Sequence, residues 1–246
     1  MNKHDNRDTR RRFWVSLGFV AVSLLVSPLQ AMERLTPHTA EYKVRISVIS
    51  GKLNTELSAT ESGYIAKHVI VPTGAARWFR KGVISETSEF SNSEDGVYPV
   101  AYQSRDSLSK KKIRADISFD WDTNEAKGTV NDEEIIAVLE GLSHDRVSIQ
   151  YELMHDLLND GPSEQYRLFE VDKLKTLSVR SIGTKQVKVP AGTFSATGIQ
   201  HQAENSSRVT TLWCVEELDY LPVIIEQHRK GKLKVRATLR NYTPAN

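Results

Sequence analysis

Three consecutive residues, Ser143, His144 and Asp145, have the side-chain types of a nucleophilic triad. A triad works only when serine, histidine and carboxylate hydrogen-bond in series. Neighbouring residues at the start of a helix diverge by roughly 100°, so these three cannot form a relay among themselves. The position instead favours a helix start, with Ser143 as N-cap and Asp145 at the positive end of the helix. The sequence therefore predicts no catalytic residue, and whether the protein is an enzyme stays open.

Metal sites are also not predicted. Asp120, Asp122 and Asn124 stand at alternate positions, as at the start of a calcium loop. Such a loop needs glycine at its sixth position and a bidentate glutamate at its twelfth, where this chain has Glu125 and Asn131. We expect a polar β-turn in which Asp122 or Asn124 bonds its own backbone. The histidines show no spacing typical of metal ligands, so no cofactor is expected.

Aromatic and basic residues give the best candidates for contacts. Trp78, Phe79 and Arg80 lie in "ARWFRKG", where an aromatic pair stands among cationic residues. In a strand these two aromatics would face opposite ways, leaving one exposed to a ligand or partner. Trp121 and Trp213 lie in strand-like runs and are predicted to face the interior, in a packed core or a ligand cavity.

Two basic clusters, "KKKIR" and "HRKGKLKVR", begin at Lys110 and His228. In an envelope protein they could contact anionic lipid headgroups or lipopolysaccharide phosphates. The alternative is that they are the charged outer faces of ordinary strands, which deter edge pairing.

These residues must be positioned by a sheet. Apolar and polar residues alternate from Ala40 to Val48, the pattern of a strand with one buried face. Turn signals recur about every ten residues, and in "VKVPAGTF" Pro190 and Gly192 indicate a tight hairpin. The prediction is a mainly β fold: a single curved or closed, barrel-like antiparallel sheet of roughly ten strands.

One amphipathic helix is expected within residues 142–162. Val147, Tyr151, Met154 and Leu158 recur at helical spacing. We expect this helix to pack on one face or one open end of the sheet. As a lid it would make Tyr151 and Met154 ligand contacts; in a core they would only fill space.

The first thirty-one residues resemble a signal peptide. Arginines precede an apolar run, Phe13 to Val26, which is short for a membrane span, and Ala31 suits cleavage. The general secretory route is favoured; "TRRRFW" also resembles a twin-arginine signal, and an uncleaved anchor is the alternative. We expect residues 32–246 to form a single β-rich periplasmic domain without a membrane span.

Net charge limits the classes of partner that we expect, and the cysteine content indicates the state of the thiol. Residues 1–31 hold five of the 33 Lys and Arg and two of the 31 Asp and Glu, so the remainder has a net charge of −1. This balance does not favour nucleic acid. Cys214 is the sole cysteine, lies in an apolar run, and is expected to be a buried thiol.

Four segments together resemble domain of unknown function family 3108: "ISFDWDTNEAKG", "GLSHDRVSIQYELMHDLL", "VKVPAGTFSATGIQ" and "TTLWCVEELDYLPVIIEQ". The resemblance spans roughly residues 38–242. It implies an exported, β-rich envelope protein with a curved or closed antiparallel sheet, and no agreed reaction.

The resulting hypothesis is a non-enzymatic periplasmic binding or carrier protein for an apolar or amphipathic envelope molecule, such as a lipid. An envelope structural or assembly factor that binds other proteins is the first alternative. A hydrolase of envelope polymers is the second.

Overall fold

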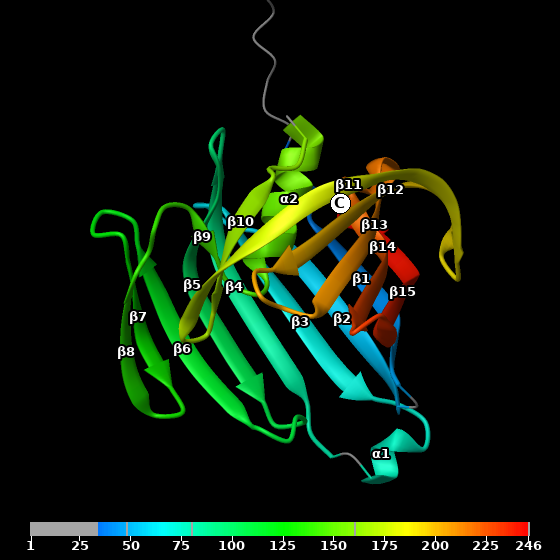
Figure 1. Ribbon diagram of the computed structural model, residues 1–246, viewed down its shortest axis with the longest axis horizontal. Helices are drawn as coiled ribbons and strands as arrows, with labels where there is room; N and C mark the ends of the chain where they lie inside the picture. The colour runs from blue at the N-terminus through cyan, green and yellow to red at the C-terminus, as the bar shows by residue number, and fades with distance from the viewer. Residues whose placement is uncertain (1–33, 48, 80, 160, 246) are drawn as a thin grey trace, which may run out of the picture. The chain divides into compact units, whose positions relative to one another are not determined.

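The computed structural model describes residues 34–47, 49–79, 81–159 and 161–245. These residues form one 15-stranded sheet in the order β8-β7-β6-β5-β4-β3-β2-β1-β15-β14-β13-β12-β11-β10-β9 (Figure 1). Each neighbouring pair is antiparallel except β9 and β10, which are parallel. The predicted signal peptide, residues 1–31, lies outside the described residues.

The elements follow one another along the chain with short connections. The strands are β1 (His38–Ile46), β2 (Ile49–Ala59), β3 (Tyr64–Pro72), β4 (Ile84–Ser93), β5 (Gly96–Asp106), β6 (Ile113–Asp120), β7 (Glu125–Val130), β8 (Glu133–Val138), β9 (Ser143–His144), β10 (Gln165–Glu170), β11 (Lys173–Val189), β12 (Gly192–Ala203), β13 (Arg208–Val215), β14 (Leu221–Arg229) and β15 (Lys232–Pro244). The helices are α1 (Ala76–Phe79), α2 (Ser148–Asn159) and the 3-10 turn η1 (Glu216–Leu218).

The period-two pattern of the first strand sets the inner face of the sheet. Ala40, Tyr42 and Val44 on β1 are buried, whereas the residues between them are half-buried or exposed. Across the β1–β15 ladder, Tyr42 is paired with Leu239 and Val44 with Ala237, and both partners are buried. The apolar residues of neighbouring strands therefore share one face, as the alternation requires.

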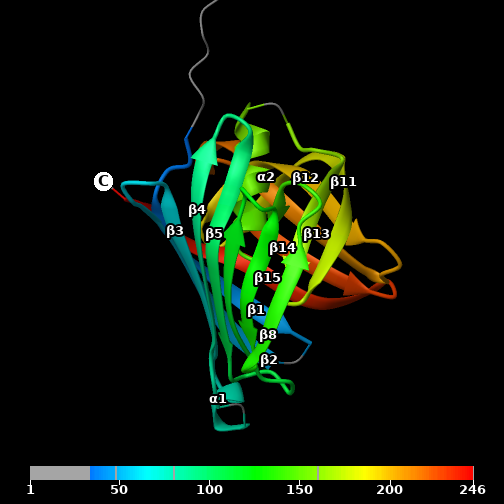
Figure 2. The same ribbon diagram turned by 90° about the vertical axis from the view of Figure 1, so that its left-hand side faces the viewer.

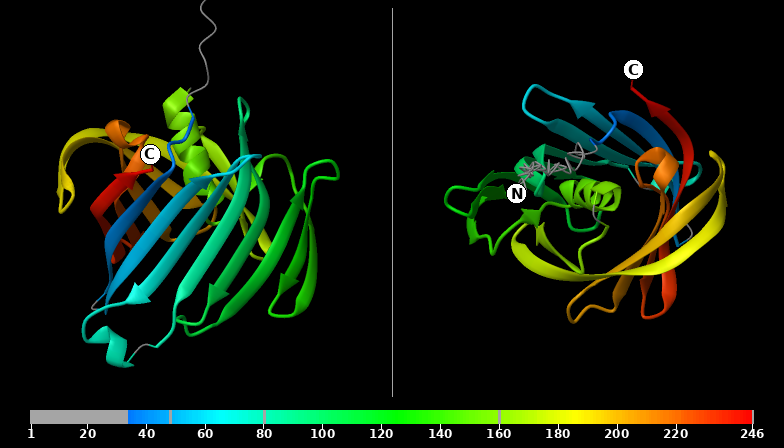
Figure 3. Two further views of the ribbon diagram at one scale, coloured as in Figure 1. Left: turned by 180° about the vertical axis from the view of Figure 1, so that it is seen from behind. Right: turned by 90° about the horizontal axis from the view of Figure 1, so that it is seen from above.

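The sheet curls around α2, which lies on its concave side in the view from above (Figure 3) and at the upper end of the strands in Figure 2. The hydrogen-bonded order ends at β8 and β9, so the sheet is open. The expected mainly β, barrel-like sheet is thus present, but the estimate of roughly ten strands was wrong. Short strands such as β8, β9 and β10 were missed because six residues or fewer carry too little periodicity.

The start of the helix differs from the expectation. Ser143 and His144 form β9, and Ser143 Oγ donates to Gly141 O (2.9 Å) and caps no helix. Asp145 does the capping, because its Oδ1 accepts hydrogen bonds from Val147 N (2.7 Å) and Ser148 N (2.9 Å). Asp is as favourable an N-cap as Ser. Ser143 cannot cap the helix because it lies in β9, which pairs with β10.

Two predicted turns are present. Val189 pairs with Gly192 across a two-residue loop, which confirms the hairpin. At the β6–β7 turn, Asp120 Oδ1 accepts from Asp122 N and Thr123 N (both 3.0 Å), so the bonding side chain is Asp120, not Asp122 or Asn124. In the described part of the chain, no helix has the length and apolar character needed to cross a bilayer.

Candidate functional site

One side of α2 is packed into the main core. Tyr151 is 0 % exposed and Met154 1 %, and Tyr151 stacks on Phe90 of β4 with ring centroids 5.3 Å apart. His68 of β3 lies at 6.2 Å from the same ring. These contacts hold α2 against β3 and β4 without an intervening space.

Buried polar contacts fix the same side of the helix. Asp145 Oδ2 accepts from Ser88 Oγ on β4 (2.6 Å), and Glu152 Oε2 accepts from Val97 N on β5 (2.6 Å). Gly96 permits this approach, because a Cβ there would lie 2.9 Å from both carboxyl oxygens of Glu152. The position of the helix on β4 and β5 is therefore fixed by hydrogen bonds as well as by packing.

The pair formed by His144 and Glu152 is not an ion pair at neutral pH. Burial raises the pKa of Glu152 to about 8, with a further increase from Asp156. Burial also lowers the pKa of His144 to about 3. The 3.7 Å between His144 Nε2 and Glu152 Oε1 thus separates a neutral imidazole from a protonated carboxyl.

The other side of α2 borders a cavity of about 610 Å³. It lies between the helix and the concave faces of β10 to β14. Its lining includes apolar residues of a second buried cluster, polar residues and several cations: Arg146, Ile149, Gln150, Leu153, Tyr166, Leu168, Glu170, Lys175, Leu177, Val179, Ile199, His201, Ala203, Asn205, Ser206, Ser207, Arg208, Thr210, Leu212, Ile225, Gln227 and Arg229.

The strand register arranges this lining in rows of increasing polarity. The first row is apolar: Ile199 pairs with Leu212, which pairs with Ile225. The second row is uncharged and mostly polar, and runs Val179, His201, Thr210, Gln227. In the third row Arg208 lies directly opposite Arg229. The cavity therefore has an apolar floor and a cationic mouth.

The two mouth arginines are uncompensated. Lys175 is ion-paired with Glu170, and Arg146 Nη1 lies 3.2 Å from Glu86 Oε1. Within the described part of the chain, neither the Arg208 nor the Arg229 guanidinium has a carboxylate partner. Burial lowers the pKa of His201 to about 4, so its imidazole is neutral at pH 7. Like charges opposite one another on adjacent strands destabilise a sheet unless something neutralises them.

The aromatic candidates from the sequence lie elsewhere. Trp78 and Phe79 are in the short helix α1, not a strand, and are both exposed. Trp121 is half-buried, with Nε1 donating to Pro99 O (2.7 Å). Trp213 is buried beside Gly198, with Lys185 Nζ 3.6 Å from a ring centroid. Since residues alternate along β13, Trp213 faces away from the cavity that Leu212 lines.

Tyr151 and Met154 also lie outside the cavity lining, in the core on the other side of α2. Arg80 is outside the described residues. None of the other candidates, all of which the structure describes, is part of the cavity. Sequence reasoning missed the cavity residues in "GIQHQA" and "RVTTL". In both segments every second residue changes from apolar to polar along one face of the strand, which is a signal that could have been used. The pairing of Arg208 with Arg229 can be recognised only when the strand register is known.

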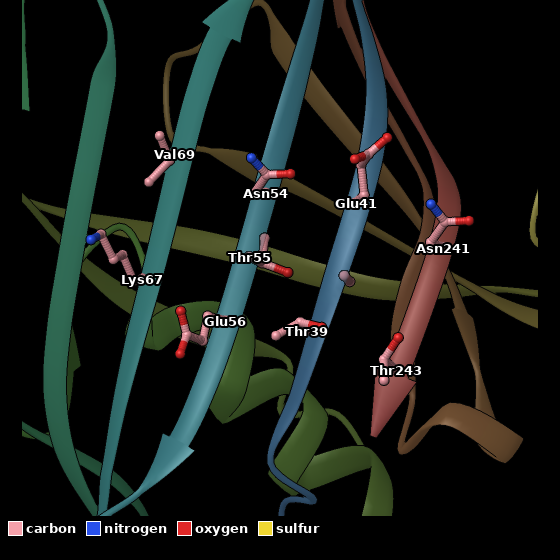
Figure 4. Close-up of a pocket in the computed structure, with 10 residues that line it drawn as sticks. Thr39, Glu41, Asn54, Thr55, Glu56, Lys67, Val69, Asn241 and Thr243 are labelled. Atoms are coloured by element: carbon pink, nitrogen blue, oxygen red, sulfur yellow. The ribbon is translucent and has the colours of Figure 1, made fainter. Parts of the chain in front are cut away.

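A second hollow, of about 420 Å³, lies on the opposite face of the sheet. Figure 4 shows its side chains on β1, β2, β3 and β15, among them Glu41, Lys67 and Asn241. One of its two carboxylates is already neutralised, because Glu41 lies 3.2 Å from Lys52 Nζ and 3.6 Å from Arg240 Nη1. This surface lacks the apolar floor of the cavity beside α2.

Ser143, His144 and Asp145 do not form a relay. Ser143 bonds Gly141, His144 faces Glu152, and Asp145 caps α2 and bonds Ser88 and Ser148. No group of three or more His, Cys, Asp or Glu is placed to hold a metal ion in the ranges that the structure describes. Cys214 is buried, as expected, and burial raises the pKa of its thiol.

The fold is that of a β-barrel-like protein. The β-barrel-like protein of domain of unknown function DUF1849 from Brucella abortus superposes with a TM-score of 0.60, over 87 % of this chain and 100 % of that chain, at 13 % identity. A protein with a YmcC-like fold from Bacteroides fragilis matches with a TM-score of 0.32, 12 % identity, and coverage of 84 % and 95 %. A protein from Parabacteroides distasonis matches with a TM-score of 0.31 and 12 % identity, over 86 % of this chain and 100 % of that chain. The latter two similarities are too weak to carry an argument.

The family is shown by sequence. A profile described as "Protein of unknown function (DUF3108)" matches residues 38–238, so the chain belongs to this family, as its motifs indicated. A comparison with curated proteins gave no match.

Proposed function

We propose that the protein is an exported binding or carrier protein whose cavity holds an amphiphile with an apolar tail and an anionic head. The observation that supports it is the gradient from Ile199, Leu212 and Ile225 to the unpaired Arg208 and Arg229. An apolar floor recognises a hydrocarbon chain, and two adjacent guanidiniums recognise phosphate or carboxylate.

The size of the cavity agrees with this ligand class. A volume of about 610 Å³ falls within the range of roughly 300–1,000 Å³ typical of small-molecule sites. Its polar middle row, with neutral His201, offers hydrogen bonds without charge. A ligand without an apolar part would make no contact with the apolar row, and a pure hydrocarbon would leave both arginines without an anionic partner.

The periplasm is the compartment proposed for this activity. The support is the N-terminal pattern of arginines, apolar run and Ala31. In that compartment amphiphiles with anionic heads are abundant at both neighbouring membranes, so a carrier has substrates of this class on either side.

The test is a titration of the protein with dodecyl phosphate, followed by displacement of an apolar fluorescent probe. The wild type should bind dodecyl phosphate at least about tenfold more tightly than dodecanol, and the double variant Arg208→Gln, Arg229→Gln should lose that preference. Arg236→Gln, Arg240→Gln is the matched control: it removes the same charge from arginines that lie 3.4 Å and 3.6 Å from Glu226 and Glu41. Equal affinity for both ligands in the wild type would contradict the proposed head-group site.

A protein-binding role is the second candidate, on one observation. β8 is an edge strand, and its Ile136 and Val138 are 71 % and 70 % exposed. Exposed apolar edge strands recruit an additional strand from a partner. An assembly factor would lose capture of a specific envelope protein when Ile136 and Val138 are replaced with Lys, whereas a carrier would keep its ligand affinity.

A further inference from the structure

Three connections lie at one end of the sheet. Because successive strands are antiparallel, the β3–β4, β5–β6 and β7–β8 connections all lie at the end where β1 finishes. We call this the α1 end, since α1 lies in the β3–β4 connection and projects beyond the strands (Figures 1 and 2).

The α1 end exposes two large aromatic side chains. Trp78 is 81 % and Phe79 86 % exposed, more than any other large apolar residue among those that the structure describes. No core contact accounts for them, because α1 has no buried residue. An aromatic pair held out in this way on a surface tip contacts something outside the fold.

Hydrogen bonds join the β5–β6 loop, which contains the basic cluster, to the segment that follows α1. Ser107 N donates to Val83 O (2.9 Å), and Val83 N donates to Ser107 Oγ (3.0 Å). The loop then continues through three exposed lysines, Lys110, Lys111 and Lys112. Two segments that are about thirty residues apart in the sequence, an aromatic contact candidate and a basic cluster, thus lie at the same end of the sheet.

The connections at the two ends of the sheet carry opposite charges. Those at the α1 end, with the residues flanking them, hold the cations Arg77, Lys81, Lys110, Lys111 and Lys112, against the acids Asp106, Asp132 and Glu133. Those at the opposite end hold the acids Glu61, Glu94, Asp95, Asp120, Asp122, Glu140, Glu216, Glu217 and Asp219, against the cation Arg146, which is paired with Glu86. Asp106 is occupied by its own loop, because Oδ1 accepts from Leu108 N and Ser109 N.

We propose that the α1 end docks reversibly on a bilayer surface rich in anionic lipid, with Trp78 and Phe79 inserted at the headgroup level. Aromatic rings favour the membrane–water interface, and clustered lysines are attracted to anionic headgroups. The acidic opposite end is repelled by the same surface, so the charge polarity orients the molecule. A protein partner would need no such separation of charge between the two ends.

The docking does not rest on the proposed ligand. Arg208 and Arg229 flank the β12–β13 and β14–β15 connections, and the β14–β15 hairpin lies apart from α1 (Figure 2).

The test is flotation of the whole protein with vesicles of phosphatidylcholine alone or with about 30 % phosphatidylglycerol. We expect binding to the anionic vesicles that falls with salt, and about a tenfold loss for Trp78→Ser, Phe79→Ser and for Lys110→Gln, Lys111→Gln, Lys112→Gln. Binding through the apolar N-terminal segment would be the same on neutral and anionic vesicles and the same in every variant, so these comparisons separate it from binding through the α1 end. Ile136→Ser, Val138→Ser, which removes exposed apolar residues from the β8 edge, is the control and should bind like the wild type.

Three results would overturn the docking surface. The first is equal binding of the wild type to neutral and anionic vesicles, and the second is unchanged binding by both α1-end variants. The third is that replacing Trp78 and Phe79 changes the oligomeric state of the protein and leaves vesicle binding unaffected. Since α1 buries no residue, the circular dichroism spectra should match and loss of folding should not confuse the comparison.

Discussion

The two sides of α2 show how one helix can both complete a core and leave a binding site. Toward β3, β4 and β5, Tyr151 and Met154 are fully buried, and Asp145 and Glu152 bond to Ser88 and to the backbone of Val97. Toward β12, β13 and β14, the helix faces a cavity of about 610 Å³.

The hydrogen bonds from α2 to β4 and β5 keep the cavity on the other side of the helix open. A helix free to slide would collapse onto Leu212 and Ile225, because burying apolar surface is favourable. Directional bonds to β4 and β5 resist that movement. Variants on the two sides should therefore have different effects: loss of stability on one side and loss of binding on the other.

The largest effect is expected from Tyr151→Ala, Met154→Ala. Each side chain is buried, and truncation of such residues costs about 2–5 kcal/mol of unfolding free energy. The double variant should unfold at a much lower urea concentration and take up no additional apolar probe. Ile149→Ala, on the cavity side of the same helix, should cost about 1 kcal/mol or less and weaken probe binding instead. If the double variant stayed stable and bound more probe, α2 would be a lid, contrary to this account.

The next effect concerns Asp145. Replacing it with Ala removes the cap of α2 and leaves the hydroxyls of Ser88 and Ser148 without their acceptor, at a cost of about 2–4 kcal/mol. Asp145→Asn keeps an oxygen for the backbone amides and should lose less. Chemical denaturation of both variants measures the difference; equal stability of Asp145→Ala and the wild type would show that the cap is dispensable.

The raised pKa of Glu152 predicts that the stability of the folded protein depends on pH. Its pKa rises from an ordinary 4.5 to about 8 in the folded protein, so the folded state holds a proton that the unfolded chain releases. The resulting stabilisation is complete below pH 4.5 and is lost as pH rises through about 8. Between pH 6.5 and 8.5 the Tm of the wild type should fall by roughly 4–8 °C more than that of Glu152→Gln, which stays neutral. Parallel Tm curves would assign the pH dependence to other groups.

The smallest effect is a gain of stability. Arg208 and Arg229 repel each other at the cavity mouth, so Arg208→Gln, Arg229→Gln should stabilise the ligand-free protein by about 0.2–1 kcal/mol while weakening the binding of anionic amphiphiles. Thermal unfolding in low salt shows this difference best, because salt screens it. A loss of stability would mean that the guanidiniums contribute to the fold, not to a ligand site.

The sequence predicted the sheet better than the site. Alternation identified β1 and the spacing of Val147, Tyr151 and Met154 identified α2, because both patterns are local and periodic. The strand total was underestimated, since a two-residue strand such as β9 has no period. Trp121 and Trp213 were predicted to face a core or a ligand cavity; both pack against the core, and neither is among the residues that line the cavity beside α2.

The site itself depends on register, which local sequence does not determine. Arg208 and Arg229 are twenty-one residues apart and become neighbours only through the β13–β14 ladder. The basic loop at Lys110 and the aromatic pair at Trp78 were recognised separately; the hydrogen bonds between Val83 and Ser107 unite them.

The most direct test of the central claim is native mass spectrometry of the protein isolated from its own host without detergent, compared with Ala203→Trp and Ser178→Trp. Ala203 lines the cavity, whereas Ser178 lies on the opposite face of β11 from Leu177, so only Ala203→Trp should block the site. The account predicts a stoichiometric adduct, extractable as an anionic lipid, in the wild type and Ser178→Trp and its absence in Ala203→Trp. A bare mass for the wild type, or an adduct that persists in Ala203→Trp, would contradict it.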